Sequence, residues 1–103
     1  MSEIVKDGDQ TIVKPGQDVM ASMAEGFRNE LRSLVEESPK ELVVDFDGVE
    51  MVDSVGIGVL IATHNSLESA GGKLKIKNVS NNILRIFKTM RLDQHFEIII
   101  PEL

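Results

Sequence analysis

The most informative part of this sequence is the decapeptide Val52-Asp53-Ser54-Val55-Gly56-Ile57-Gly58-Val59-Leu60-Ile61. Apolar residues recur in it at helical spacing, and they follow an aspartate and a serine, two residue types that often cap a helix start. The pattern therefore predicts a helix with Asp53 or Ser54 as its N-cap. A helix start carries unpaired backbone N–H groups and the positive end of the helix dipole, so it can accommodate a phosphate. The Ser54 hydroxyl is the candidate phosphoacceptor.

Two glycines fall in or beside the first turn of this predicted helix. In a helix interior, Gly56 and Gly58 would each cost about 1 kcal/mol relative to alanine. Close approach by another backbone is a physical reason to omit both side chains. That backbone could belong to the domain itself or to a partner protein.

Outside this decapeptide, strand and helix patterns alternate without a linker or repeat. The expected strands are a short hairpin around Asp7-Gly8-Asp9, a buried strand at Leu42–Phe46, an alternating strand at 73–79 and an edge strand at Phe96–Ile100 closed by Pro101. These strands, with helices between them, predict a single domain over residues 1–103. Its fold class is α/β, with a small mixed sheet of four to five strands and helices packed against it.

Three helices are expected between these strands. The first has Asp18 as a plausible N-cap and ends before Ser38-Pro39. The second is the helix after Asp53, which ends at Ala70-Gly71-Gly72. The third is capped by Ser80 or Asn81, and its inward residues are predicted to be Ile83, Leu84, Ile86 and Phe87.

The composition excludes several classes of protein. The 103 residues include no cysteine, so neither a disulfide framework nor a thiolate metal site can form, which fits a reducing cytoplasm. The start, Met1-Ser2-Glu3, lacks the basic and apolar pattern of a secretion signal, and no apolar run approaches the roughly 20 residues that span a bilayer. We therefore expect a cytoplasmic protein without membrane insertion.

The net charge of −6 argues against general nucleic-acid binding, but the charge is unevenly distributed. Residues 36–53 contain one lysine, Lys40, against seven acidic residues: Glu36, Glu37, Glu41, Asp45, Asp47, Glu50 and Asp53. Residues 73–91 contain no acidic residue and six basic ones: Lys73, Lys75, Lys77, Arg85, Lys88 and Arg91. The two segments could be ordinary solvated faces, or they could form a polarised surface that steers a partner.

Motifs for catalysis are incomplete. A Gly-x-Ser-x-Gly nucleophile elbow would need glycine at Val52, and a dinucleotide fingerprint starting at Gly56 would need glycine at Ile61. On one helix, His64 would lie about 15 Å from Ser54, far beyond hydrogen-bond reach. His64 and His95 alone do not provide a metal-binding set. The sequence therefore predicts no enzyme, no metal and no cofactor.

The order of these features resembles a known family. An acidic loop leads into Asp53-Ser54-Val55-Gly56-Ile57-Gly58-Val59-Leu60, followed by Ala70-Gly71-Gly72-Lys73-Leu74 and a helix ending in Phe87-Lys88-Thr89-Met90-Arg91-Leu92. This order resembles the STAS domain and, more narrowly, the single-domain bacterial anti-sigma-factor antagonists. One position departs from the family pattern, because Val55 stands where the family often has serine or threonine.

The resemblance implies a phosphorylation-switched binding module. Ser54 would be phosphorylated by a partner that is both an anti-sigma factor and a serine kinase, and a serine/threonine phosphatase would reverse the modification. The unphosphorylated form would capture the partner. The expected partner-binding residues are Asp47, Glu50, Asp53, Gly56, Ile57 and Gly58. The alternative is a ligand-binding or transporter-accessory module of the same fold that is never phosphorylated.

Overall fold

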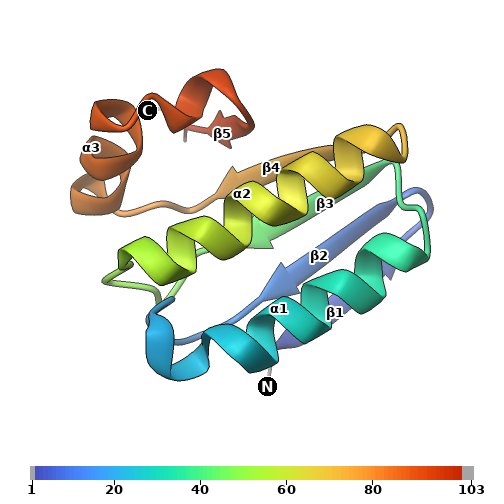
Figure 1. Ribbon diagram of the computed structural model, residues 1–103, viewed down its shortest axis with the longest axis horizontal. Coiled ribbons are helices and arrows are strands. Elements are labelled where there is room, and N and C mark those ends of the chain that lie inside the picture. The colour runs from blue at the N-terminus through green and yellow to red at the C-terminus, as the bar shows by residue number, and fades with distance from the viewer. Residues whose placement is uncertain (1, 101–103) are drawn as a thin grey trace.

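A computed structural model describes residues 2–100, in which strands and helices alternate along the chain (Figure 1). The elements are β1 (Glu3–Asp7), β2 (Gln10–Lys14), α1 (Ala21–Glu36), β3 (Glu41–Asp45), α2 (Ser54–Ser69), β4 (Lys73–Lys77), α3 (Asn81–Thr89), the short 3-10 helix η1 (Leu92–Gln94) and β5 (Glu97–Ile99). The strands form one sheet in sequence order. The pair β1–β2 is antiparallel and the other pairs are parallel, which confirms the predicted α/β class with a mixed sheet.

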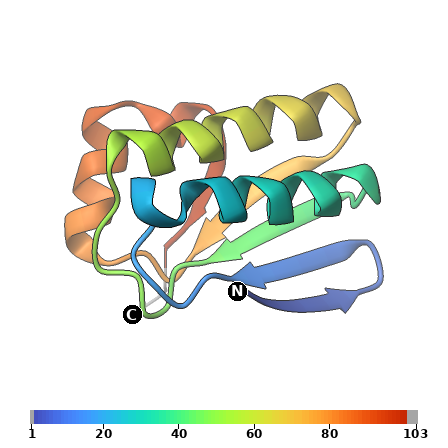
Figure 2. The ribbon, with the colours of Figure 1, turned by 60° about the horizontal axis from the view of Figure 1, so that its bottom comes forward.

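The helices lie on one side of the sheet, and the other face has no helix among the described residues (Figure 2). Each parallel connection moves one strand along the sheet, and right-handed connections of this kind place successive helices on the same side. Buried residues alternate along β2 and β4, as expected for strands covered on one face. In the central strand β3, Leu42, Val43 and Val44 are all buried, which agrees with the prediction of a buried strand there. The largest fully buried side chains include Phe27, Leu31, Leu42, Phe46, Leu60, Leu67, Leu74, Ile76 and Phe87. None of the described helices is long and apolar enough to cross a membrane.

The prediction that Asp18 caps the first helix is wrong. Helix α1 begins at Ala21, and its N-cap residue, Met20, makes no side-chain capping hydrogen bond. The Asp18 Oδ1 atom instead accepts hydrogen bonds from the backbone N–H groups of Glu50 and Met51, at 2.9 and 3.1 Å. Asp18 therefore organises the loop that precedes α2, a contact that local sequence does not reveal.

In the C-terminal part, the predicted N-cap of α3 is confirmed, but one inward-facing residue and the end of one strand differ from the prediction. The Ser80 Oγ atom accepts the backbone N–H of Ile83 at 3.3 Å, so Ser80 is the N-cap of α3. Ile86 is 37% exposed, so the prediction that it points inward is wrong. Strand β4 ends at Lys77, before residue 79, and η1 was not predicted. The strand β5 lies at the sheet edge as expected, and Pro101 lies outside the described residues.

Backbone pairing joins the segments that lead into α1 and α2. Val19 and Val52 form a short parallel bridge. The Val19 N–H donates to the Met51 carbonyl at 3.0 Å, and the Asp53 N–H donates to the Val19 carbonyl at 3.3 Å. These bonds place the starts of the two helices side by side.

The Asp53 carboxylate serves both helices. Its Oδ1 atom accepts the backbone N–H of Gly56 in α2, and its Oδ2 atom accepts the backbone N–H of Ala21 in α1, each at 2.8 Å. The hydrogen bond from Gly56, followed by the one from Ala21, holds the pKa of Asp53 below its ordinary value, because both bonds favour the charged form. This confirms that Asp53 is the N-cap of α2.

The two glycines of α2 have different surroundings. A Cβ atom added to Gly56 would lie 2.8 Å from the carbonyl carbon of Val19 and closer still to the carbonyl oxygen. A Cβ atom added to Gly58 would meet nothing within 4 Å. The domain's own backbone therefore requires glycine at position 56 and does not require it at position 58.

The different surroundings of Gly56 and Gly58 predict that a glycine-to-alanine substitution affects the stability of the fold differently at the two positions. Gly56→Ala should destabilise the fold by about 1–3 kcal/mol or more, because the methyl group must displace the Val19 backbone. Gly58→Ala should leave stability unchanged or raise it by up to about 1 kcal/mol, because alanine is the better helix former. Urea unfolding of the two variants measures both effects, and equal stability of the two would contradict the assignment.

The lowered pKa of Asp53 predicts a dependence of stability on pH. A carboxyl group with a depressed folded-state pKa stabilises the fold above its unfolded value, here 3.8, and that contribution is lost as the pH falls through the folded value. Wild type should therefore be more stable than Asp53→Asn at pH 7, and the difference should shrink from about pH 5 downwards. Free energies of unfolding at several pH values test this. A difference that stays constant down to pH 2 would contradict it.

Candidate functional site

Ser54 is exposed as the first residue of α2. It follows the loop that leaves the carboxyl end of β3, and the backbone on either side is held by the bonds of Val19 and Asp53 described above. A phosphate at this point would adjoin the N-terminal N–H groups of a sixteen-residue helix. Ser54 is thus exposed beside backbone that is held by hydrogen bonds, a geometry that suits a phosphoacceptor.

The loop between β3 and α2 carries the acidic residues that lie nearest in sequence to Ser54. Asp47 and Glu50 are exposed. An Asp47 carboxylate oxygen lies 3.2 Å from Lys14 Nζ, and this hydrogen bond raises the pKa of the lysine. The Asp47 N–H donates to Asp45 Oδ1 at 2.9 Å, and the same oxygen accepts Asn78 Nδ2 at 2.9 Å. The loop is therefore tied to the carboxyl ends of two strands while Glu50 projects into solvent.

The structure separates the predicted partner-binding residues into two groups. Asp47, Glu50 and Gly58 are exposed and Asp53 is half-buried, so these four have surface to offer. Gly56 and Ile57 are buried, and Ile57 belongs to the hydrophobic core. These two residues therefore offer little surface to a partner in this structure, and their expected role in partner binding stays a prediction.

Two apolar residues beside Ser54 were not predicted as site residues. Met51 is 56% exposed, and Val55 is 43% exposed. From hydropathy alone, Met51 and Val55 would be expected in the core. The hydrogen bond from the Met51 N–H to Asp18 fixes the loop, and the Asp53 cap fixes the start of α2, so that both side chains face solvent. Together with Ser54 they make a partly apolar surface bordered by acidic groups.

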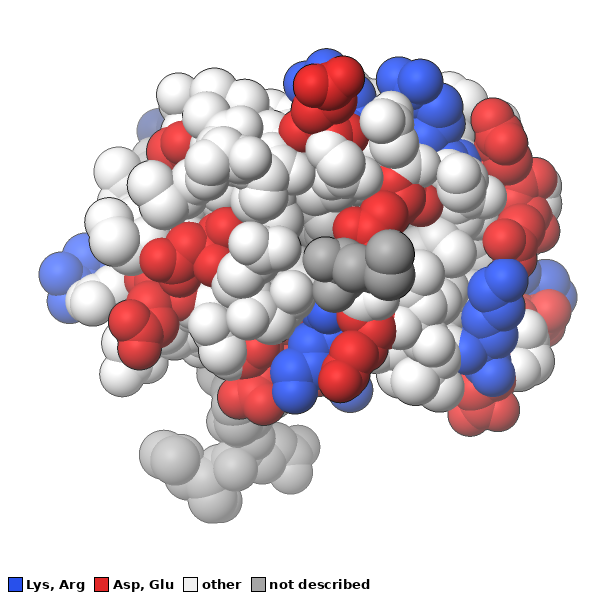
Figure 3. Space-filling view, turned by 90° about the horizontal axis from the view of Figure 1, so that it is seen from below, with Lys and Arg blue, Asp and Glu red and all other residues white. Residues whose placement is uncertain are grey.

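The basic segment 73–91 is partly neutralised within the sheet. Lys75 forms an ion pair with Glu41, which belongs to the acidic segment, and lies 3.7 Å from Glu97. These contacts raise the pKa of Lys75, chiefly through the hydrogen bond to Glu41. On the face shown in Figure 3, acidic and basic side chains are intermixed and no continuous basic area is present. That face does not have the charge distribution that nucleic-acid binding requires.

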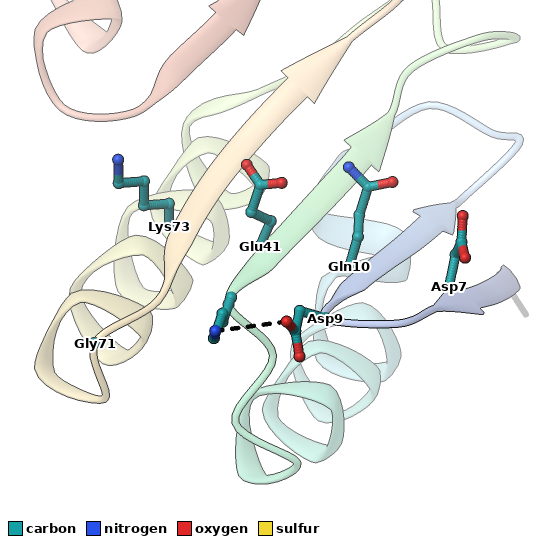
Figure 4. A pocket seen from close by; sticks show the side chains of 7 residues that line it. Asp7, Asp9, Gln10, Glu41, Gly71 and Lys73 are labelled. Atoms are coloured by element: carbon teal, nitrogen blue, oxygen red, sulfur yellow. Dashed lines mark ion pairs between the residues drawn. The ribbon is translucent and has the colours of Figure 1, made fainter.

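A hollow of about 550 Å³ lies at the amino ends of β2, β3 and β4, the end of the strands opposite to Ser54 (Figure 4). Its walls carry both signs of charge, including an ion pair in which Lys40 Nζ lies 3.5 Å from Asp9. The other polar residues at its edge are Asp7, Gln10, Glu41 and Lys73. The hollow therefore does not present a single sign of charge.

The two histidines contact each other, which the sequence did not predict. The ring of His64 lies 6.2 Å from that of His95 and 6.0 Å from that of Phe96, between centroids, and its Nε2 atom lies 3.4 Å from the Glu68 carboxylate. These contacts pack α2 against the segment that enters β5. Within residues 2–100, no group of three or more histidine, aspartate or glutamate side chains is arranged to hold a metal ion.

Comparisons with known proteins agree on the fold. An anti-sigma-B factor antagonist from Bacillus subtilis (strain 168) is 31% identical over 72 residues, which make up 70% of this chain and 65% of that protein. This chain thus matches slightly less than two thirds of that relative's length. A structure from Thermotoga maritima superposes with a TM-score of 0.91 at 19% identity, covering 97% of this chain and 86% of the other.

The Bacillus protein SpoIIAA is similar in both of its forms. The unphosphorylated form has a TM-score of 0.77 at 12% identity, covering 99% of this chain and 90% of that one. The phosphorylated form has a TM-score of 0.75 at 14% identity, covering 97% and 92%. At these identities the superpositions establish the fold alone.

The family model described as the STAS domain matches residues 2–102, nearly the whole chain. This match confirms the resemblance seen in the decapeptide and in the order of strands and helices around it. The chain belongs to the STAS domain family.

Proposed function

We propose that this protein is an anti-sigma-factor antagonist that acts as a binding module and not as an enzyme. It captures an anti-sigma factor when Ser54 is unphosphorylated and releases it when Ser54 carries a phosphate. The observation that carries the proposal is the position of Ser54, exposed at the first residue of α2 on a backbone fixed by Asp53. The name of the Bacillus subtilis relative supports the choice of an anti-sigma factor as the partner.

The proposed cycle needs two partner activities. The anti-sigma factor is also the serine kinase that transfers phosphate from ATP to the Ser54 hydroxyl. A serine/threonine phosphatase hydrolyses the phosphoserine and restores the capturing form. The existence of SpoIIAA in phosphorylated and unphosphorylated forms supports such a cycle for this fold.

Charge and desolvation explain how one phosphate could release the partner. The phosphate adds a charge of about −1.5 to −2 at pH 7, next to a loop that already exposes Asp47 and Glu50. Met51 and Val55 flank the serine with apolar surface, and a partner that covers them removes water from the modified residue. An unpaired charge in such a contact is costly, so phosphorylation weakens the complex without unfolding the domain.

Phosphorylation by the partner kinase tests the acceptor. Intact-mass measurement after incubation with ATP and the cognate anti-sigma-factor kinase should show one added phosphate on wild type and none on Ser54→Ala. Ser69→Ala is the matched control, because Ser69 is another exposed serine of α2, and it should be modified like wild type. Equal modification of wild type and Ser54→Ala would reject Ser54 as the acceptor.

A charge substitution tests the release step. Ser54→Asp should weaken binding to the same kinase by about tenfold or more. Asparagine has nearly the shape of aspartate but no charge, so Ser54→Asn should bind within about threefold of wild type. Isothermal titration with the purified partner measures both affinities. If the two variants bind equally well, charge at Ser54 is not the switch; if wild type does not bind the partner at all, the transporter-accessory or ligand-binding alternative becomes the better account.

A further inference from the structure

We propose that the groove between α1 and α2 is a second docking surface, and that it binds an acidic amphipathic helix of a partner protein. The proposal does not depend on phosphorylation of Ser54. The two helices run side by side over the sheet, and their outer faces point away from the strands (Figures 1 and 2). Between them lies a hollow of about 310 Å³, lined mainly by Arg28, Arg32 and Val35 of α1 and by Val59, Ala62 and Ser66 of α2.

The floor of this groove is apolar. Val59 is buried, Val35 is half-buried, and Ala62 is exposed. The Thr63 hydroxyl at the floor already donates to the Val59 carbonyl at 2.8 Å, so its proton is not available to a ligand. A surface of this kind suits the apolar face of a helix better than a small polar molecule.

The α2 wall of the groove allows a second helix to approach closely. Ala62 and Ser66 line the hollow, and Gly58 lies one turn before Ala62, outside that lining. All three are exposed and recur every four residues, so they lie along one side of α2. Nothing in the domain lies within 4 Å of a Cβ atom added at Gly58, so the domain's own packing does not account for a glycine that lowers helix stability. Contact with another protein would account for it.

The α1 wall determines the charge of the occupant. Arg28 and Arg32 are exposed and one turn apart. The ion pairs of the described residues use the lysines Lys6, Lys14, Lys40 and Lys75, and one further contact joins the His64 ring to Glu68. Neither arginine is neutralised in this way, although the chain as a whole carries a net charge of −6. Guanidinium groups bind carboxylates with two parallel hydrogen bonds, so this wall favours an acidic ligand.

Glu36 limits where the acidic groups of the ligand can lie. It also lines the hollow, one turn beyond Arg32 on α1. Its carboxylate would repel a third acidic residue placed there. The structure therefore favours a helix that carries two carboxylates four residues apart opposite the arginines, and apolar residues toward Val59 and Ala62.

A peptide titration of the isotope-labelled full chain tests the proposal. The probe is a synthetic helix of about four turns, with leucine and alanine on one face and two glutamates four residues apart along the edge of that face. The counterpart has lysine in place of both glutamates. Backbone amide shifts should change around residues 28–36 and 58–66 with the acidic peptide, and binding of the lysine peptide should be at least about tenfold weaker. No shifts in these segments, or equal binding of both peptides, would overturn the proposal.

Variants of the groove separate docking from general charge effects. Arg28→Gln combined with Arg32→Gln should weaken binding of the acidic peptide by about tenfold, while Lys73→Gln combined with Lys77→Gln, which removes the same charge elsewhere, should change it by less than about threefold. Ala62→Leu should also weaken binding, because Ala62 lines the groove and a larger side chain would occupy it, and thermal unfolding should show that the variant is folded. Equal effects of the arginine and lysine pairs would show non-specific electrostatic attraction and would refute the groove.

Discussion

At the junction between the starts of α1 and α2 there is no room for a side chain at position 56, because a Cβ atom added to Gly56 would lie 2.8 Å from the carbonyl carbon of Val19. The close approach of these two backbones brings the start of α1 against the start of α2. The Val19–Val52 bridge holds the two segments in register, and the Asp53 carboxylate then reaches a backbone N–H in each helix. Helix position, helix phase and the exposure of Ser54 all follow from this one junction.

Each of the two aspartates near the junction, Asp18 and Asp53, accepts backbone hydrogen bonds from the other segment. Asp18 precedes α1 and binds the loop before α2, whereas Asp53 precedes α2 and also binds the first residue of α1. The start of α1 and the loop before α2 are therefore each held by a carboxylate from the other segment, whereas the first turn of α2 is also capped locally by Asp53. We expect a modification of Ser54 to act on the surface presented to a partner and not on the fold.

The features that the sequence predicted are those set by local periodicity. Alternating residues around Leu74 and the helical spacing after Asp53 identified the strand and helix, because side-chain direction repeats every two or 3.6 residues. The role of Asp18 and the exposure of Met51 depend on contacts between residues about 30 positions apart or on loop shape, which no local pattern contains. The two glycines illustrate the same limit, since sequence assigned both to close approach and only the structure separates Gly56 from Gly58.

The first turn and the later turns of α2 expose different kinds of side chain. The first turn presents Ser54 beside Met51, Val55 and an acidic loop, whereas the later turns present small side chains facing the arginines of α1. Ser54 and Ser66 are twelve residues apart, which corresponds to about 18 Å along a helix, so one partner could contact both regions through different parts of its surface. Added charge at Ser54 would remove the contacts at the first turn and leave those at the groove. Binding would then be weakened in a graded manner, with the remaining affinity set by the α1–α2 groove.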